Sequence, residues 1–361
     1  MRKLLLAFVC FVFALQVFAK TETNFEKAQI KKLMINATLW QLNNPRHELT
    51  DWTNGAFYAG ISAAYKTTHD ERLKQAMLDM GEKNQWKLGP DIKFADDQAI
   101  AQTYVDLYRI TKDRKMIEPF IKRLDEFKVT PYKTDLKKCI TWWWCDALFM
   151  APPAYVKLGV ALNDQSYLTL TDSLFKETYD LLYSKEDHLF YRDNGYFSKK
   201  EKNNQKIFWS RGNGWVMGGL ALILTELPAN YKTRPFYEKL FKEMARKIAD
   251  IQQTDGLWRA SLLDPESYPG GEASGSGFYT YALAWGINNG LLDRKEYLPV
   301  VKKAWLGMCT LVQPDGRVGW VQQIGADPQL NFSPTVTEVY GTGAFLLAGS
   351  EVLRAIISKT L

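Results

Sequence analysis

One carboxylate lies in the most aromatic dozen residues of the chain. Asp146 follows three tryptophans within the stretch WWWCDALFMAPP, residues 142–153. Burial among apolar side chains disfavours the charged form of a carboxyl group and raises its pKa, so such an acid can donate a proton near neutral pH. The alternative is a helix cap, in which the carboxylate accepts N–H groups of the following helix. The residues alone leave both roles for Asp146 open.

Two further groups of residues could serve such an acid. Asp96 and Asp97 are adjacent in the stretch FADD, where they could supply a second acid or form a cap pair. Arg211 and Trp215 are four residues apart in SRGNGW, which places them on one face of a helical turn. There they could form a carboxylate clamp beside a sugar-stacking ring, or only a cation–π pair at the surface.

Several other chemistries lack the residues that they need. The three histidines are too few and too dispersed for a metal site, and the glycines around Arg211 follow no strand and precede no P-loop lysine. We therefore expect no metal and no cofactor. Acidic and basic residues are interspersed at a net charge of +6, which argues against a nucleic-acid partner. Cys139 and Cys145 could be bridged, or they could be buried free thiols.

The first residues have the pattern of a secretory signal peptide. A positive start, MRK, leads into a long apolar run and ends at the small-residue site Val17-Phe18-Ala19. We expect residues 1–19 to be removed and the protein to be exported, to the periplasm or beyond, without a membrane span. Residues 20–361 would then form the mature chain.

Hydrophobic patterning predicts an all-α protein. Stretches rich in glycine, alanine and apolar residues suit helices that are packed on every side; they cover 55–65, 99–110, 152–162, 214–227, 278–288 and 341–353. Amphipathic stretches with charged faces alternate with them, at 24–42, 71–83, 113–128, 164–183, 234–253 and 295–311. Six inner and six outer helices predict an (α/α)6 barrel, and we expect it to form one domain over residues 20–361.

The unusual residues precede the predicted inner helices. They lie in loops at 51–55, 94–97, 142–146, 209–214, 271–277 and 333–341. In a barrel these loops would meet at one rim, together with helix N-termini, whose free N–H groups favour anions. Aromatic, basic and acidic residues around such a bowl predict a site for an acidic sugar.

The motifs resemble those of the unsaturated glycuronyl hydrolases. DWTNGAFYAG, FADDQ, the WCD of Trp144 to Asp146 followed by LFMAPP, and FWSRGNGW are similar to glycoside hydrolase family 105, and more distantly to family 88. The resemblance implies an (α/α)6 barrel that acts without a metal on short oligosaccharides left by polysaccharide lyases. Their terminal uronic acid carries a C4=C5 double bond. An acid protonates C4, water adds at C5, and the next sugar is expelled.

The resemblance also implies roles for individual residues. Asp146 would be the general acid and base, and one of Asp96 and Asp97 would be the second acid. The residues implied to contact the substrate are Arg211, Trp215, Trp144, Met150, Trp52 and Asn54. Where family members often have a histidine in an LFYH-like run, this chain reads LFYRD, with Arg192 at that place and His188 four residues earlier. Both are candidate binding residues, and an arginine would favour a more anionic, for example sulfated, sugar.

Other functions stay open at this point. Asp146 with Asp96 or Asp97 could be the carboxylate pair of an ordinary inverting glycosidase. A non-catalytic carbohydrate-binding protein is a further alternative, and a sugar epimerase would need histidines at the rim. The polysaccharide could be pectic rhamnogalacturonan or ulvan, since both yield an unsaturated uronyl group linked to rhamnose. The oligomeric state is not predicted.

Overall fold

The computed structural model describes residues 23–129, 140–330 and 332–358. The expected signal peptide, residues 1–19, and Cys139 lie outside the described residues. No described helix is long and apolar enough to cross a membrane.

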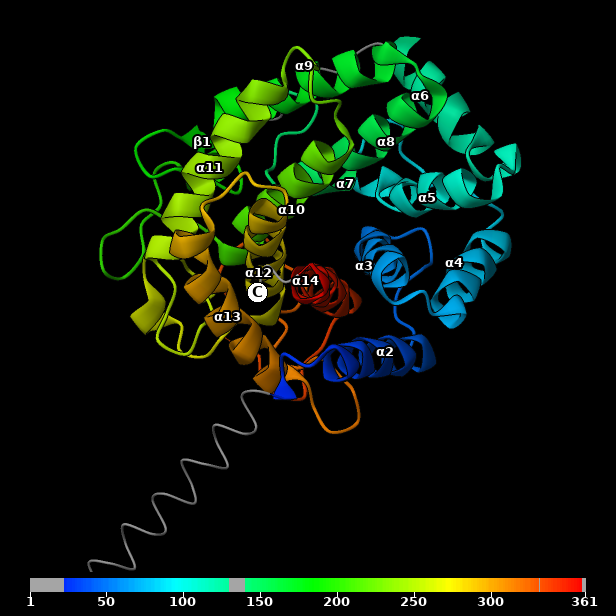
Figure 1. Cartoon of the computed structure of the whole chain (residues 1–361). Helices are drawn as coiled ribbons and strands as arrows, with labels where there is room; N and C mark the ends of the chain where they lie inside the picture. Colours follow the sequence, from blue (N-terminus) through cyan, green and yellow to red (C-terminus); the bar gives the residue numbers. More distant parts are fainter. Residues whose placement is uncertain (1–22, 130–139, 331, 359–361) are drawn as a thin grey trace, which may run out of the picture.

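A closed ring of inner helices forms the centre of the protein (Figure 1). Each inner helix contacts the next, and the last contacts the first. The ring consists of α3 (Trp52–Thr68), α5 (Ala101–Thr111), α8 (Pro152–Leu162), α10 (Ser210–Glu226), α12 (Ala273–Asn288) and α14 (Val339–Ile357). Their side chains are buried nearly all round, as the composition predicts.

A second layer of amphipathic helices surrounds this ring. It consists of α2 (Lys27–Asn43), α4 (Glu71–Lys83), α6 (Glu118–Val129), α9 (Gln165–Leu182), α11 (Arg234–Asp250) and α13 (Arg294–Leu311). Several of these helices begin at an aspartate, such as Asp164 before α9, whose carboxylate accepts a backbone N–H of the first turn. The predicted (α/α)6 barrel is confirmed. That residues 20–361 form one domain stays a prediction.

Glycines allow the inner helices to approach closely. A Cβ on Gly214 of α10 would lie 3.1 Å from the Cα of Gly275 in α12, and a Cβ on Gly60 of α3 would lie 2.5 Å from the carbonyl oxygen of Gly343 in α14. The stretch 209–214 was expected to be a rim loop, and this expectation is wrong in part. Helix α10 already begins at Ser210. Its glycines lie within the helix and leave space for neighbouring helices instead of forming a turn.

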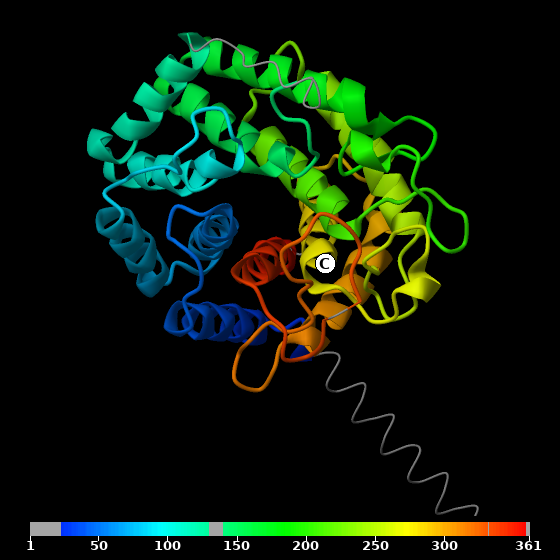
Figure 2. The same cartoon turned by 180° about the vertical axis from the view of Figure 1, so that it is seen from behind.

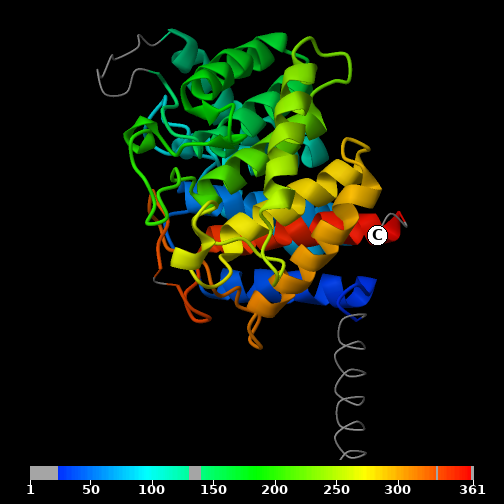
Figure 3. The ribbon, with the colours of Figure 1, turned by 90° about the vertical axis from the view of Figure 1, so that its left-hand side faces the viewer.

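Long connections lead from the outer helices into the inner ones at one end of the barrel. Figure 2 shows them crossing this end, and Figure 3 shows it from the side, with the C-terminus of α14 at the opposite end. They contain the short elements η1 (Asp96–Gln98), α7 (Ala147–Met150), β1 (Tyr183–Ser184), β2 (Leu189–Phe190), η3 (Asn194–Tyr196) and η4 (Pro265–Ser267). The turn into α6 contains η2 (Arg114–Met116). We call the end with the long connections the mouth.

A buried ion pair joins three inner helices. The Asp106 carboxylate of α5 accepts hydrogen bonds from the Lys157 ammonium of α8 and the Ser62 hydroxyl of α3, both at 2.7 Å. The partly exposed Lys66 lies 3.0 Å from its other oxygen. Burial alone would raise the pKa of Asp106, but the charges of Lys157 and Lys66 outweigh it and hold the pKa below its ordinary value. The folded state therefore favours the ionised Asp106 carboxylate, and this contribution is lost only in strong acid, while burial opposes the charge of Lys157 and lowers its pKa.

We predict that Asp106→Asn destabilises the fold, because it leaves the buried Lys157 ammonium without its charged partner. Breaking a buried pair from one side costs about 3–5 kcal/mol of unfolding free energy. Urea denaturation followed by circular dichroism measures this loss. Asp125→Asn is the control, since Asp125 is exposed and its ion pair with Lys128 is long, at 3.9 Å. An Asp106→Asn variant as stable as this control would contradict the assignment.

Candidate active site

Asp146 lies at the mouth, immediately before α7, and is 9% exposed. Its carboxylate accepts no capping hydrogen bond from the helix that follows, so the helix-cap alternative has no support in the structure. Its near neighbours are the Cys145 thiol, whose sulfur is 3.6 Å from Oδ2, and Arg192, whose Nε is 3.8 Å from the same oxygen. Cys145 is a free, buried cysteine.

Opposing effects determine the protonation of Asp146. Burial raises the pKa of its carboxyl group, while the positive charges of Arg192 and Arg211 lower it. Burial is the larger effect, and the pKa stays above the ordinary value. Asp146 therefore keeps its proton to a higher pH than a solvated aspartate does, as its aromatic surroundings predict, and so it is more available as a general acid.

The structure distinguishes between the two adjacent acids. Asp97 holds its own loop in place: its carboxylate accepts the backbone N–H of Asp91 at 2.6 Å, and its carbonyl accepts that of Gly89 at 2.9 Å. Asp96 instead interacts with Asp146. Burial raises the pKa of Asp96 well above its ordinary value, and the negative charge of Asp146 raises it further. Oδ1 of Asp96 is buried and has no hydrogen-bond partner among the described residues.

The three consecutive tryptophans have three different surroundings. Trp142 is fully buried against Tyr155, and its carbonyl accepts the Thr178 hydroxyl of α9 at 2.6 Å, so it anchors the loop in the core. The ring of Trp143 lies under the guanidinium of Arg192, 5.3 Å from its centroid. Trp144 stacks on Phe94, a 38% exposed side chain that the sequence reading did not select.

Arg211 is fastened to the long connection before α14. Its terminal nitrogens donate to the backbone carbonyls of Gln322 and Gln323 and to the Tyr340 hydroxyl, and the guanidinium lies between the rings of Trp209 and Tyr340. Only 1% of Arg211 is exposed. Its Nε is also buried and has no hydrogen-bond partner among the described residues, and the expected carboxylate clamp stays a prediction. Its positive charge lowers the pKa of Asp146.

The aromatic residues expected at the rim meet one another. Trp52 stacks on Tyr340 with ring centroids 5.2 Å apart, and its edge contacts Trp215 at 5.9 Å. Trp215 is fully buried against Phe149 and Phe278 and supports the rings of Trp52 and Tyr340. Trp52 is the partly exposed residue of these three.

Two expected binding residues have mainly structural contacts. The Asn54 amide donates to the backbone carbonyls of Arg46 and Glu48, at 3.0 and 2.9 Å, and fixes the loop before α3. Met150 is 1% exposed in α7, with its backbone carbonyl close to the Gln102 amide. Both shape the mouth without presenting a free polar group to it.

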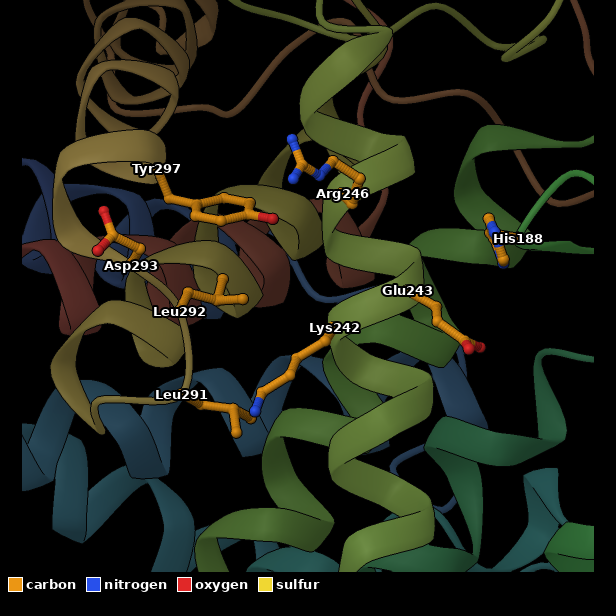
Figure 4. A pocket seen from close by; sticks show the side chains of 8 residues that line it. All are labelled: His188, Lys242, Glu243, Arg246, Leu291, Leu292, Asp293 and Tyr297. Atoms are coloured by element: carbon orange, nitrogen blue, oxygen red, sulfur yellow. The ribbon is translucent and has the colours of Figure 1, made fainter.

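His188 is not brought to Asp146. It lies in the turn between β1 and β2, where Nδ1 is 3.1 Å from the Tyr183 hydroxyl. Figure 4 shows it at the edge of a surface pocket of about 530 Å³, with Glu243 and Arg246 of α11 and Tyr297 of α13. Since these are outer helices, His188 is on the outside of the barrel.

Gln322 is a central residue of the mouth that the sequence reading missed. It is 1% exposed; its N–H donates to Glu272, its carbonyl accepts Arg211, and its side chain binds the backbone at Asp327 and Gln329. A lone glutamine in a long connection carries no pattern that would reveal these contacts. Within the described part of the chain, no group of His, Cys, Asp or Glu could hold a metal ion.

Comparison with known proteins identifies the family. The family model for Glycosyl Hydrolase Family 88 matches residues 24–356, which is most of the chain. The chain belongs to glycosyl hydrolase family 88. This match extends over the whole barrel, from α2 to α14.

Relatives of this family 88 chain have different descriptions. It is 46% identical over 358 residues to an unsaturated 3S-rhamnoglycuronyl hydrolase of Formosa agariphila, with 94% of each chain covered. A solved structure described as a polysaccharide lyase has a TM-score of 0.86 and 34% identity, covering 92% of this chain and 98% of that one. A family 88 glycosyl hydrolase from Bacteroides vulgatus has a TM-score of 0.84 and 32% identity, covering 91% and 99%.

In this family 88 chain we predict that Arg211→Lys loosens the connection around Gln322. A lysine cannot hold two carbonyl groups and a hydroxyl in the fixed geometry of a guanidinium. Amide hydrogen exchange followed by mass spectrometry should be about tenfold faster in residues 320–325, the effect of losing one charge-assisted hydrogen bond. The control is Arg72→Lys on α4, whose partner is the surface residue Asp70. Equal exchange in both variants would contradict the assignment.

Proposed function

We propose that the protein is a hydrolase that removes the terminal 4,5-unsaturated uronic acid from lyase-generated oligosaccharides. The observation that carries the proposal is the buried acid Asp146, which sits beside a second acid and an arginine at the mouth of a family 88 barrel. The name of the Formosa agariphila relative, an unsaturated 3S-rhamnoglycuronyl hydrolase, supports the same chemistry.

Asp146 performs both proton transfers in the proposed reaction. Its carboxyl group gives a proton to C4 of the double bond, and the positive charge that results is shared by C5 and the ring oxygen. Water attacks C5 and returns one proton to the Asp146 carboxylate. The hemiketal at C5 then opens to a ketone, which leaves a hemiacetal at C1. The hemiacetal collapses to an aldehyde and expels the next sugar, so one water is consumed and Asp146 is regenerated.

The neighbouring residues have supporting roles in this scheme. Asp96, with its raised pKa, is the second acid of the site, and its unpartnered oxygen is available to a substrate hydroxyl or the attacking water. Trp52 and Phe94 offer partly exposed rings on which sugar faces can pack, and the buried Trp144 supports the ring of Phe94. The positive charge of the buried Arg211 lowers the pKa of Asp146 and so limits the effect of burial.

We propose rhamnose as the sugar that is expelled, because the Formosa agariphila relative is named for rhamnoglycuronyl substrates. Such linkages come from ulvan or from pectic rhamnogalacturonan. We also propose that the chain is closer to family 105 than to other members of family 88, on the motifs described above. Export by residues 1–19 is part of the same proposal, because lyase products arise where polymers are degraded.

We predict that the protein removes the enol-ether absorbance of an unsaturated uronyl-rhamnose disaccharide and releases one rhamnose per absorbing group. The matched disaccharide with a saturated glucuronyl group should stay intact, because it has no double bond to protonate. Cleavage of both disaccharides would instead indicate an ordinary glycosidase. A rise in absorbance on intact ulvan or rhamnogalacturonan would indicate a polysaccharide lyase.

We predict different effects for the three acids. Asp146→Asn should fold normally and lose activity by several orders of magnitude, because an amide cannot donate and recover the proton. Asp96→Asn should lose about a hundredfold or more, the range of a single acid–base group. Asp97→Asn is the matched control: asparagine still accepts the Asp91 N–H, so kcat/KM should stay close to that of the unchanged protein. An active Asp146→Asn variant would show that another carboxylate is the acid.

A further inference from the structure

Arg192 lies within ion-pair distance of Asp146. It follows β2 in the connection to α10, with its side chain 20% exposed. Its Nε lies 3.8 Å from Oδ2 of Asp146, which is too long for a hydrogen bond. Nε is also buried and has no hydrogen-bond partner among the described residues.

Three contacts hold Arg192 in this position. Its Nη1 donates to Asp193 at 2.7 Å, and Asp193 is itself fixed by the backbone N–H of Gly195 at 2.8 Å. The carbonyl of Arg192 accepts the backbone N–H of Cys145 at 2.9 Å, which ties it to the residue before the acid. The ring of Trp143 supports the guanidinium from one side. The guanidinium is therefore pre-positioned, with Nη1 occupied and the Nε edge directed toward Asp146.

A buried donor without a partner is unfavourable, and a partner that is missing from the protein can be supplied by a ligand. The Nε edge of a guanidinium matches a carboxylate or sulfate, whose two oxygens can accept parallel hydrogen bonds. We propose that the Nε edge of Arg192 binds an anionic group of the substrate beside Asp146. This proposal rests on the proposed function.

The expected substrate class carries two anionic groups with this chemistry. One is the carboxylate on C5, next to the carbon that Asp146 protonates. The other is a sulfate on the neighbouring rhamnose, the group implied by the name of the Formosa agariphila relative. Both present oxygens that a guanidinium edge can bind, and matched substrates distinguish them.

Binding of an anion at Arg192 also affects the acid. The groups that act on Asp146 are Arg192, Arg211 and the Cys145 thiol, and Asp96 interacts with it from η1. In the free protein the charge of Arg192 opposes the effect of burial on the pKa of Asp146. A bound anion neutralises that charge, so Asp146 holds its proton more firmly once the substrate is in place. Arg192 then couples substrate binding to the readiness of the acid.

The test measures kcat and KM for Arg192→Gln and Arg192→Lys on two unsaturated uronyl-rhamnose disaccharides, with and without a 3-sulfate. Losing a charge-assisted bond should raise KM about tenfold to a hundredfold in Arg192→Gln. Arg192→Lys keeps the charge without the flat guanidinium edge, and its KM should lie between those of the unchanged protein and Arg192→Gln. A rise for both substrates identifies the uronyl carboxylate as the anion, and a rise for the sulfated one alone identifies the sulfate. Arg72→Gln on α4 is the control, since its partner Asp70 is at the outer surface.

The pH dependence of activity distinguishes this role of Arg192 from a purely structural one, which would not shift the pH at which activity falls. Activity requires protonated Asp146, so it falls as the pH rises through the pKa of this residue. Without the opposing charge of Arg192, the falling limb for the free enzyme should move to higher pH in Arg192→Gln. Unchanged KM values for both substrates would overturn the proposal. An unchanged protein inactive on both substrates would instead overturn the proposed function.

Discussion

The mouth of the barrel depends on keeping carboxyl groups out of water. Burial raises the pKa of both Asp146 and Asp96, and the negative charge of Asp146 raises that of Asp96 further. The positive charges of Arg192 and Arg211 oppose the effect of burial at Asp146. Because a change of one pKa unit corresponds to about 1.4 kcal/mol, small changes in these positions decide whether the acid carries its proton.

The barrel supplies the rigidity that this balance needs. Each residue of the site lies at the start of an inner helix or in the connection before it, and the ring is closed by glycine contacts and by the buried pair of Asp106 and Lys157. Gln322 and Arg211 then fasten the connection before α14 against the start of α10. The site is therefore held by elements far apart in the chain.

The fold was predictable from helix periodicity. Helices with small residues on all sides can be buried in an inner ring, and amphipathic helices can cover that ring with one face, so few other arrangements are stable. The raised pKa of Asp146 was also predictable, from its aromatic surroundings. The different roles of the neighbours Asp96 and Asp97 were not predictable. Only the folded chain shows that Asp97 fixes the loop of residues 89–97 and that the charge of Asp146 acts on Asp96. Arg211 was expected to bind substrate because of the motif SRGNGW. Its contacts with the carbonyls of Gln322 and Gln323, which are over a hundred residues away, leave no sequence pattern.

The protonation of Asp146 can be measured directly. The infrared difference spectrum between the unchanged protein and Asp146→Asn isolates the carboxyl and carboxylate bands of this one side chain, and a pH series gives the point at which the proton is lost. Because burial outweighs the effect of the two arginines, we predict that Asp146 retains its proton above the ordinary aspartate pKa of about 3.9. Loss of the proton at or below that value would contradict the account, because Asp146 could not then serve as the acid near neutral pH.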